Sequence, residues 1–245
     1  MKKMAIVIVN LLTTVRVVGV GCLLPIYLKH GGVAAALLSM GCYFTDWIDG
    51  VIARKCHAST FFGSTYDGVA DKMFSVANLI VLFTITKYAI VPIIFEALII
   101  VVQTIKYHHN ENVKSSNMGK LKTWIISFTV ISLYLLIDIK ALTFLPAGLI
   151  NNILSYNQTK LFGAIFAPLY VFEVLTLLSY LRFLKGNEPD VKTEIPKIDI
   201  KLKPVHSLKD RFDNWCYLWL NNEFYEKYKD CAGLKKIKKS IQHGS

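Results

Sequence analysis

The sequence predicts an all-α, polytopic membrane protein with six transmembrane helices and a cytoplasmic C-terminal tail. Of its 245 residues, 53% are hydrophobic and 18% are charged, whereas soluble domains carry about 25% charged residues. The mean hydropathy is +0.43. Charges are sparse in residues 1–185, which contain 24 of them, and dense in residues 186–245, which contain 21. The chain therefore divides into a membrane domain over 1–185 and a basic, partly amphipathic tail over 186–245.

The membrane domain contains apolar stretches long enough to cross the ~30 Å hydrocarbon layer of a bilayer, which takes about 20 helical residues. Six can be laid out, approximately over 5–27, 33–53, 61–87, 89–106, 123–142 and 161–183. An even number of spans puts both termini on one side. Ten Lys and Arg lie near span ends on that side and four lie opposite, so we expect both termini to face the cytoplasm, with the protein in the cell membrane.

One stretch of this domain leaves alternatives open. Residues 139–158 are apolar in part but short for a crossing. They allow a surface segment, a re-entrant segment or a seventh span, and the last of these would invert the tail.

The tail begins with a stretch that contains three prolines, which predicts an extended linker over its first 20 or so residues. An amphipathic helix is expected after it. Its apolar face would comprise Leu208, Phe212, Trp215, Cys216, Trp219 and Leu220. This face suits either the membrane interface or the cytoplasmic surface of the protein's own membrane domain. The net charge of +11 favours anionic lipid, and we expect no nucleic-acid partner.

Four of the eight acidic residues of the membrane domain lie within 26 positions. Asp46 and Asp49 are three residues apart and Asp67 and Asp71 are four apart, so each pair shares one face of a helix. The stretch between the pairs is polar, which predicts a tight turn between antiparallel helices. We therefore expect the four carboxylates to meet at the membrane surface.

A carboxylate inside a membrane costs about 2.5–3.5 kcal/mol on insertion scales, so a cation must offset the cluster. Carboxylate oxygens without Cys or clustered His suit a hard ion such as magnesium, manganese or calcium. Four of them can hold two ions about 3.5–4 Å apart, the spacing used in phosphoryl transfer. The simpler alternative is that the acids pair with Arg54, Lys55 and Lys72 at a helix end. Small residues nearby favour a ligand site.

The acids and these small residues form one pattern: Asp46-x-x-Asp49-Gly50-x-x-Ala53-Arg54, eight residues, then Gly63-x-x-x-Asp67-x-x-x-Asp71. At every defined position it resembles the signature of the CDP-alcohol phosphatidyltransferase family. The resemblance implies six transmembrane helices, with the signature across the second and third, and a homodimer.

The resemblance also implies roles for matched residues. The four aspartates (Asp46, Asp49, Asp67, Asp71) would bind two divalent cations, magnesium or manganese, that hold the diphosphate of a CDP-linked lipid. Gly50, Ala53 and Gly63 would give the nucleotide close access, and Arg54 would contact the diphosphate. Asp71 would be the general base that takes a proton from the acceptor hydroxyl, with CMP as the leaving group.

Two further segments bear on the acceptor. Asn10-Leu-Leu-Thr13-x-x-Arg16 resembles an N-terminal pattern of phosphatidylglycerophosphate synthases and their cardiolipin synthase relatives, and Gly119-Lys120-Leu121-Lys122-Thr123 resembles a second segment of that subfamily. Lys120 and Lys122 would bind an acceptor phosphate, and Asn10, Thr13 and Arg16 would support the site. Alternatively, the lysines are positive-inside anchors, and Asn10 and Thr13 are capping or packing groups.

The predicted reaction transfers a phosphatidyl group from CDP-diacylglycerol to glycerol 3-phosphate, giving phosphatidylglycerophosphate and CMP. Phe95 precedes Glu96 where such synthases usually carry an Arg-Glu pair. The same chemistry with phosphatidylglycerol as acceptor, giving cardiolipin, or with another alcohol therefore stays open. A cation-coupled membrane transporter and a catalytically silent scaffold are alternatives from other classes, because intramembrane acids also mark ion pathways.

Overall fold

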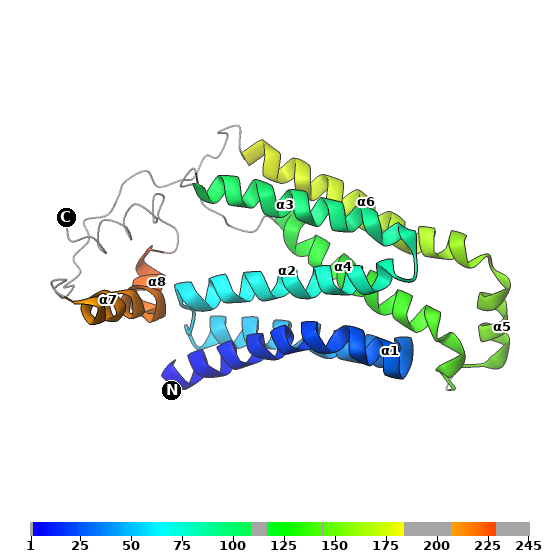
Figure 1. The fold of residues 1–245 in the computed structure, drawn as a ribbon, viewed down its shortest axis with the longest axis horizontal. Helices are drawn as coiled ribbons and strands as arrows, with labels where there is room; N and C mark the ends of the chain where they lie inside the picture. Colours follow the sequence, from blue (N-terminus) through cyan, green and yellow to red (C-terminus); the bar gives the residue numbers. More distant parts are fainter. Residues whose placement is uncertain (1, 109–116, 144, 184–206, 229–245) are drawn as a thin grey trace.

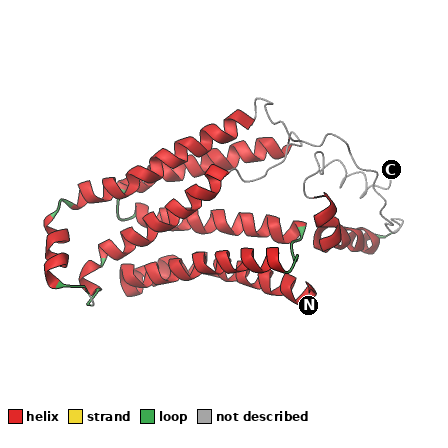
Figure 2. Ribbon diagram, turned by 180° about the vertical axis from the view of Figure 1, so that it is seen from behind, coloured by secondary structure: helices red, strands yellow, loops and turns green. Residues whose placement is uncertain are grey.

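The computed structural model describes residues 2–108, 117–143, 145–183 and 207–228, and these residues form helices and loops without a strand (Figure 2). The helices are α1 (Lys2–Lys55), α2 (Phe61–Phe83), α3 (Ile90–His108), α4 (Asn117–Ile137), α5 (Ala147–Ser155), α6 (Gln158–Phe183), α7 (Leu208–Leu220) and α8 (Asn222–Tyr228). Two 3-10 turns, η1 (Lys87–Ala89) and η2 (Ile139–Ala141), lie between them. The all-α prediction is confirmed for this part of the chain.

Helix α1 consists of two halves that run in opposite directions and lie side by side (Figure 1). The chain reverses at Gly31, whose φ of 80° is accessible to glycine at little cost. A carboxylate oxygen of Asp138 accepts a hydrogen bond from the Gly32 N–H and lies too close to Gly31 for any side chain there. The two halves match the separate apolar stretches predicted over 5–27 and 33–53.

The helices pack as a bundle in which α2 and α4 contact α1, and α6 contacts both α3 and α4. The main core draws on four helices and η1, with fully buried residues such as Leu23, Leu79, Leu133 and Phe166. Large apolar side chains also cover the outside, including Phe128, which is 66% exposed. An apolar exterior on this scale is typical of a protein surrounded by lipid.

Among the residues that the structure describes, three helical stretches are long and apolar enough to cross a membrane: Met4–Lys55, Lys87–Ile105 and Gln158–Leu181. The first contains both halves of α1. Helix α5 has nine residues and is about 14 Å long, half of the hydrocarbon thickness. Helix α5 alone is therefore too short to cross the membrane.

The predicted tail helix is present as α7, and Ser207 caps its N-terminus through a hydrogen bond from the Lys209 N–H. It contacts α2, and its buried residues are Asn214 and Leu218, whereas Leu208 and Phe212 of the predicted apolar face are exposed. The predicted apolar face is therefore only partly covered, since Trp215, Cys216 and Trp219 are half-buried. The predicted linker lies outside the described residues.

Helix α8 ties the tail to the membrane domain at the turn between α1 and α2. The side-chain amide of Asn222 donates to the carbonyl oxygens of His57 and Ser59, at 2.5 and 2.8 Å. Phe224 is buried and packs edge-on against Phe61. The N-terminus and the start of α2 lie at this same end of the bundle (Figure 1).

Candidate active site

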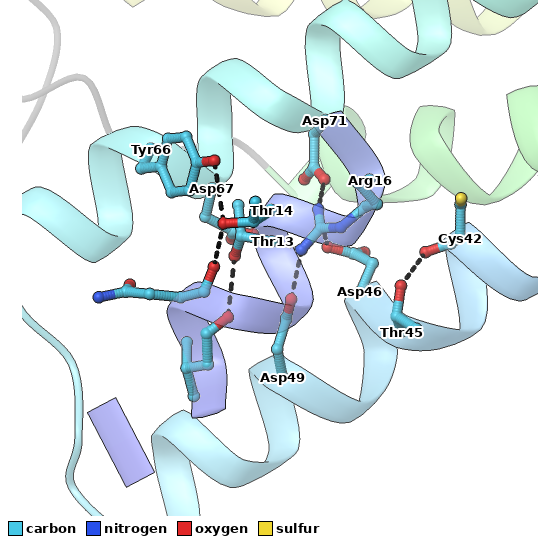
Figure 3. Close-up of polar contacts among 12 residues, drawn as sticks. Thr13, Thr14, Arg16, Cys42, Thr45, Asp46, Asp49, Tyr66, Asp67 and Asp71 are labelled. Carbon is cyan, nitrogen blue, oxygen red and sulfur yellow. Dashed lines mark hydrogen bonds and ion pairs between the residues drawn. The ribbon is translucent and has the colours of Figure 1, made fainter. Parts of the chain in front are cut away.

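The site lies where the second half of α1 ends and α2 begins. Helix α1 ends at Lys55, and α2 starts at Phe61 because the Thr60 hydroxyl accepts a hydrogen bond from the Gly63 N–H at 3.0 Å, as an N-cap does. The two segments are antiparallel neighbours, as the sequence predicts. Asp46 and Asp49 on one therefore face Asp67 and Asp71 on the other (Figure 3).

All four carboxylates surround the guanidinium of Arg16, which comes from the first half of α1 (Figure 3). Arg16 Nη1 lies 2.8 Å from Asp46 and also pairs with Asp71, while Nη2 lies 2.7 Å from Asp67 and also pairs with Asp49. The side chains of Arg16 and Asp49 are 1% and 3% exposed. The other three carboxylates are about one third exposed, so the site is open on one side.

The donor set fits a hard cation. One oxygen from each of Asp46, Asp49 and Asp67 lies within 4.8 Å of the others, which is compatible with ligation of a common ion. Asp71 reaches the same place through its contact with Arg16 Nη1. Oxygen-only ligands favour magnesium, calcium or manganese over zinc or copper. The structure thus brings together the four acids that the sequence singles out.

The predicted nucleotide-contacting residues border this cluster, but protein side chains use the space over both glycines. Arg54 folds back along α1, so that a Cβ at Gly50 would lie 3.4 Å from its Nη1 atom. A Cβ at Gly63 would lie 3.1 Å from Thr60 Oγ1 and 3.2 Å from Asn10 Oδ1. Close packing within the protein is therefore one reason for a glycine at position 63, whereas a Cβ at Gly50 would make only ordinary contact with the end of the Arg54 side chain.

The N-terminal motif faces α2. Asn10 covers Gly63, and Thr13 is buried, with its hydroxyl donating to the Val9 carbonyl at 3.1 Å. Thr14 and Tyr66 form a hydroxyl–hydroxyl hydrogen bond of 3.2 Å between α1 and α2. These contacts favour the packing interpretation of Asn10 and Thr13.

Arg16 has a more central position than the supporting one expected from sequence. It is the only charged residue between positions 4 and 28. A lone charge within an apolar span needs an opposite charge nearby. That rule, applied together with the four unpartnered acids, is the sequence signal that predicts the contact.

Lys122 does not face the carboxylate cluster as a free cation. It is buried, and its Nζ atom lies 2.6 Å from Glu96 Oε1 and 3.6 Å from Glu173 Oε2. These three residues join α4, α3 and α6, and we call them the Glu–Lys–Glu triad. Surface anchoring is thus excluded for Lys122, and any contact with an acceptor phosphate would require it to exchange partners. The side chain of Lys120 lies outside the described part of the structure.

The Glu–Lys–Glu triad is a feature that the sequence pattern does not predict. Phe95 is half-buried and the adjacent Glu96 turns into the bundle. Glu173 is fully buried, and neither of its oxygens has a hydrogen-bond partner, since 3.6 Å is an ion-pair distance only. Lys72, which follows Asp71 on α2, donates a hydrogen bond to the side chain of Gln103 on α3.

The helical bundle, its apolar exterior and the acidic cluster indicate a membrane protein with a polar site whose carboxylate oxygens suit a hard cation. The model of the CDP-alcohol phosphatidyltransferase family matches residues 6–172, and the chain belongs to this family. The resemblance found in the signature is therefore confirmed.

Individual relatives agree with this assignment. A CDP-diacylglycerol–glycerol-3-phosphate 3-phosphatidyltransferase from Pseudomonas fluorescens is 30% identical over 206 residues, which cover 79% of this chain and 95% of the relative. The enzyme of the same name from Bacillus subtilis is 35% identical over 95 residues, 37% of this chain and 49% of the relative. A cardiolipin synthase (CMP-forming) from Oryza sativa is 38% identical over 78 residues, 31% and 24% of the two chains.

Proposed function

We propose that this protein is an enzyme that transfers a phosphatidyl group from CDP-diacylglycerol to glycerol 3-phosphate, producing phosphatidylglycerophosphate and CMP. The observation that carries the proposal is the convergence of four aspartates from two antiparallel helices on one point. The relative from Pseudomonas fluorescens, which the chain matches over 95% of its length, supports the acceptor.

In this proposal Asp46, Asp49 and Asp67 hold divalent cations, magnesium or manganese, and Asp71 completes the ligand set. The chemistry that such ions supply is neutralisation of the diphosphate and of the charge that develops on departing CMP. Asp71, one third exposed, takes the proton of the acceptor hydroxyl. The hydroxyl oxygen then bonds to the lipid-side phosphorus as the bond from that phosphorus to the CMP oxygen breaks.

The substrate contacts are proposed as follows. Gly50, Ala53 and Gly63 border the nucleotide, and exposed Arg54 at the end of α1 contacts the diphosphate. Lys120 in the first turns of α4 binds the acceptor phosphate. Lys122 takes part only if it leaves the Glu–Lys–Glu triad, so we assign Lys120 the larger share.

The proposed arrangement in the membrane has six spans, formed by the two halves of α1 and by α2, α3, α4 and α6. Both termini and the carboxylate cluster then face the cytoplasm, where the soluble acceptor glycerol 3-phosphate and the product CMP are found. Residues 186–245 form a cytoplasmic tail, and the protein is a homodimer. The distribution of Lys and Arg at the span ends supports this orientation.

A second acceptor has a specific observation in its favour. Phe95 replaces an arginine expected of phosphatidylglycerophosphate synthases, which removes one cation from the acceptor side. The match to a cardiolipin synthase also covers part of this chain. Phosphatidylglycerol, which offers a hydroxyl without a terminal phosphate monoester, is therefore the alternative acceptor.

The purified protein, supplied with CDP-diacylglycerol and each acceptor separately, tests the proposal when products are identified by mass spectrometry. We expect phosphatidylglycerophosphate and one equivalent of CMP, with no reaction after chelation of divalent ions. Product only with phosphatidylglycerol would establish the alternative acceptor. Cation flux in liposomes without CDP-diacylglycerol, together with no CMP release, would instead establish a transporter.

A further inference from the structure

Arg16 connects the two aspartates on α1 with the two aspartates on α2. Its Nη1 atom bridges Asp46 on α1 and Asp71 on α2, and its Nη2 atom bridges Asp49 on α1 and Asp67 on α2. Each terminal nitrogen therefore joins one carboxylate from each signature helix (Figure 3). Divalent cations held by these carboxylates would therefore compete with Arg16 for ligands on both helices.

Metal ions and the Arg16 guanidinium compete for the same four carboxylates. Four carboxylates against one guanidinium leave a formal net charge of −3, which attracts further cations. Two divalent ions would bring four positive charges into the same space, where the Arg16 charge repels them at short range. Carboxylates that ligate an ion also bind Arg16 less strongly, because the ion neutralises the charge that attracts the guanidinium.

The Arg16 side chain reaches the cluster from the first half of α1, which carries none of the four acids, and its polar contacts are those with the carboxylates. Its side chain is 1% exposed, and the adjacent turn is tied to α2 by the bond between Thr14 and Tyr66. Its Nε atom is buried without a hydrogen-bond partner, so the guanidinium is held only through its terminal nitrogens. A side chain held in this way can withdraw without breaking other bonds of its own.

We propose that Arg16 is a positioning residue that acts as the internal cation of the metal-free site and is displaced from the carboxylates when divalent ions bind. It keeps four like charges together before loading, and it lowers the affinity of the site for metal. The inference rests on the metal site of the proposed function, but not on the reaction or on the identity of either substrate.

Manganese binding to the full-length protein, without any CDP-lipid, tests this. The electron paramagnetic resonance signal of free Mn²⁺ gives the affinity of wild type and of Arg16→Gln, which removes the competing charge. We expect Arg16→Gln to bind Mn²⁺ about tenfold more tightly, or better. An equal or weaker affinity in the folded variant would overturn the proposal.

A matched control removes a neighbouring charge that does not lie between the carboxylates. Lys55→Gln deletes an exposed cation at the end of α1, and we expect its Mn²⁺ affinity to change less than about threefold. Equal gains in Arg16→Gln and Lys55→Gln would show that the effect comes from net charge alone, and they would overturn the assignment. Asp49→Asn should weaken Mn²⁺ binding at least about tenfold, and unchanged binding would place the ions elsewhere and equally overturn it.

Stability gives an independent readout. We expect the melting temperature of Arg16→Gln to lie below that of wild type in chelator. Saturating Mn²⁺ should raise the melting temperature of Arg16→Gln more than that of wild type, because the bound ions then neutralise the carboxylates in place of Arg16. An equal loss with and without Mn²⁺ would indicate a merely structural residue. Should Arg16→Gln fail to fold, Arg16→Lys decides: its single ammonium bridges fewer oxygens, so tighter Mn²⁺ binding than wild type is expected and equal or weaker binding refutes the proposal.

These outcomes are separate from those of the activity assay. A protein that releases no CMP with any acceptor but shows the Mn²⁺ pattern would refute the proposed function and leave the role of Arg16 intact. An active enzyme whose Arg16→Gln variant binds Mn²⁺ less tightly would do the reverse.

Discussion

Replacement of Lys122 by methionine should destabilise the protein severely. Lys122→Met keeps most of the side-chain volume and removes the one ammonium that lies between Glu96 and Glu173. The three side chains are 9%, 4% and 0% exposed, so solvent does not compensate for the loss. Breaking a buried ion pair by removal of one partner costs about 3–5 kcal/mol.

The expected shift is measurable by thermal unfolding of the purified protein in detergent. For a chain of this size each kcal/mol lowers the melting temperature by about 2–4 °C, so Lys122→Met should melt about 10 °C below wild type. Lys140→Met removes an exposed lysine near η2 and serves as the matched control, with an expected change within about 0.5 kcal/mol.

The triad also predicts a difference between its two acids. Glu173→Gln should cost under about 1 kcal/mol, because Lys122 keeps Glu96 at 2.6 Å and the excess negative charge disappears. Added to Lys122→Met, the same change should recover part of the lost stability. A melting temperature of Lys122→Met equal to that of wild type would refute this reasoning, and it would return Lys122 to the set of cations available to an acceptor phosphate.

The remaining predictions concern the site and one backbone position. Asp71→Asn should lower turnover about 10²–10⁴-fold while CDP-lipid binding persists, whereas Asp46→Asn should weaken Mn²⁺ and CDP-lipid binding together; equal, mild losses in both assays would contradict the assigned roles. Lys120→Ala should raise the acceptor KM more than the CDP-lipid KM in steady-state kinetics, and the opposite pattern would remove Lys120 from the acceptor site. Gly31→Ala should cost about 1–3 kcal/mol in thermal unfolding, because its φ is positive and Asp138 fills the space, while Gly41→Ala, with open space around its Cβ, should be neutral or stabilising; similar melting of both would contradict the account of the reversal.

The parts of this fold that the sequence predicts are those set by local periodicity. Asp46 and Asp49 share a helix face because of their spacing, and the polar turn after them reverses the chain, so the facing pairs follow from short-range pattern alone. Apolar length likewise predicts the helices, and Gly31 separates the two halves of α1. Each of these features involves residues within one helix or one turn.

Features that depend on packing between distant helices were not predictable in the same way. Arg16 meets acids 30 to 55 positions further along the chain, and Lys122 meets Glu96 and Glu173 on two other helices. Periodicity identifies the apolar face of α7, but it does not say which side contacts α2. The orientation of α7, in which Asn214 and Leu218 are buried, depends on how this helix packs against the rest of the protein.

The described part of the bundle contains the Glu–Lys–Glu triad and the acidic cluster around Arg16, and the two differ in net charge and in exposure to solvent. The Glu–Lys–Glu triad carries two acids and one base, is sealed from solvent and joins three helices, as expected of a group that fixes packing. The cluster around Arg16 carries four acids and one base, and three of its carboxylates are about one third exposed. A cluster with that much uncompensated charge is unfavourable unless a soluble cation can enter, and its open side provides the entry. In the absence of metal, Arg16 offsets part of this negative charge. Replacement of Arg16 therefore tests ion binding separately from the packing of the helices that hold the ions.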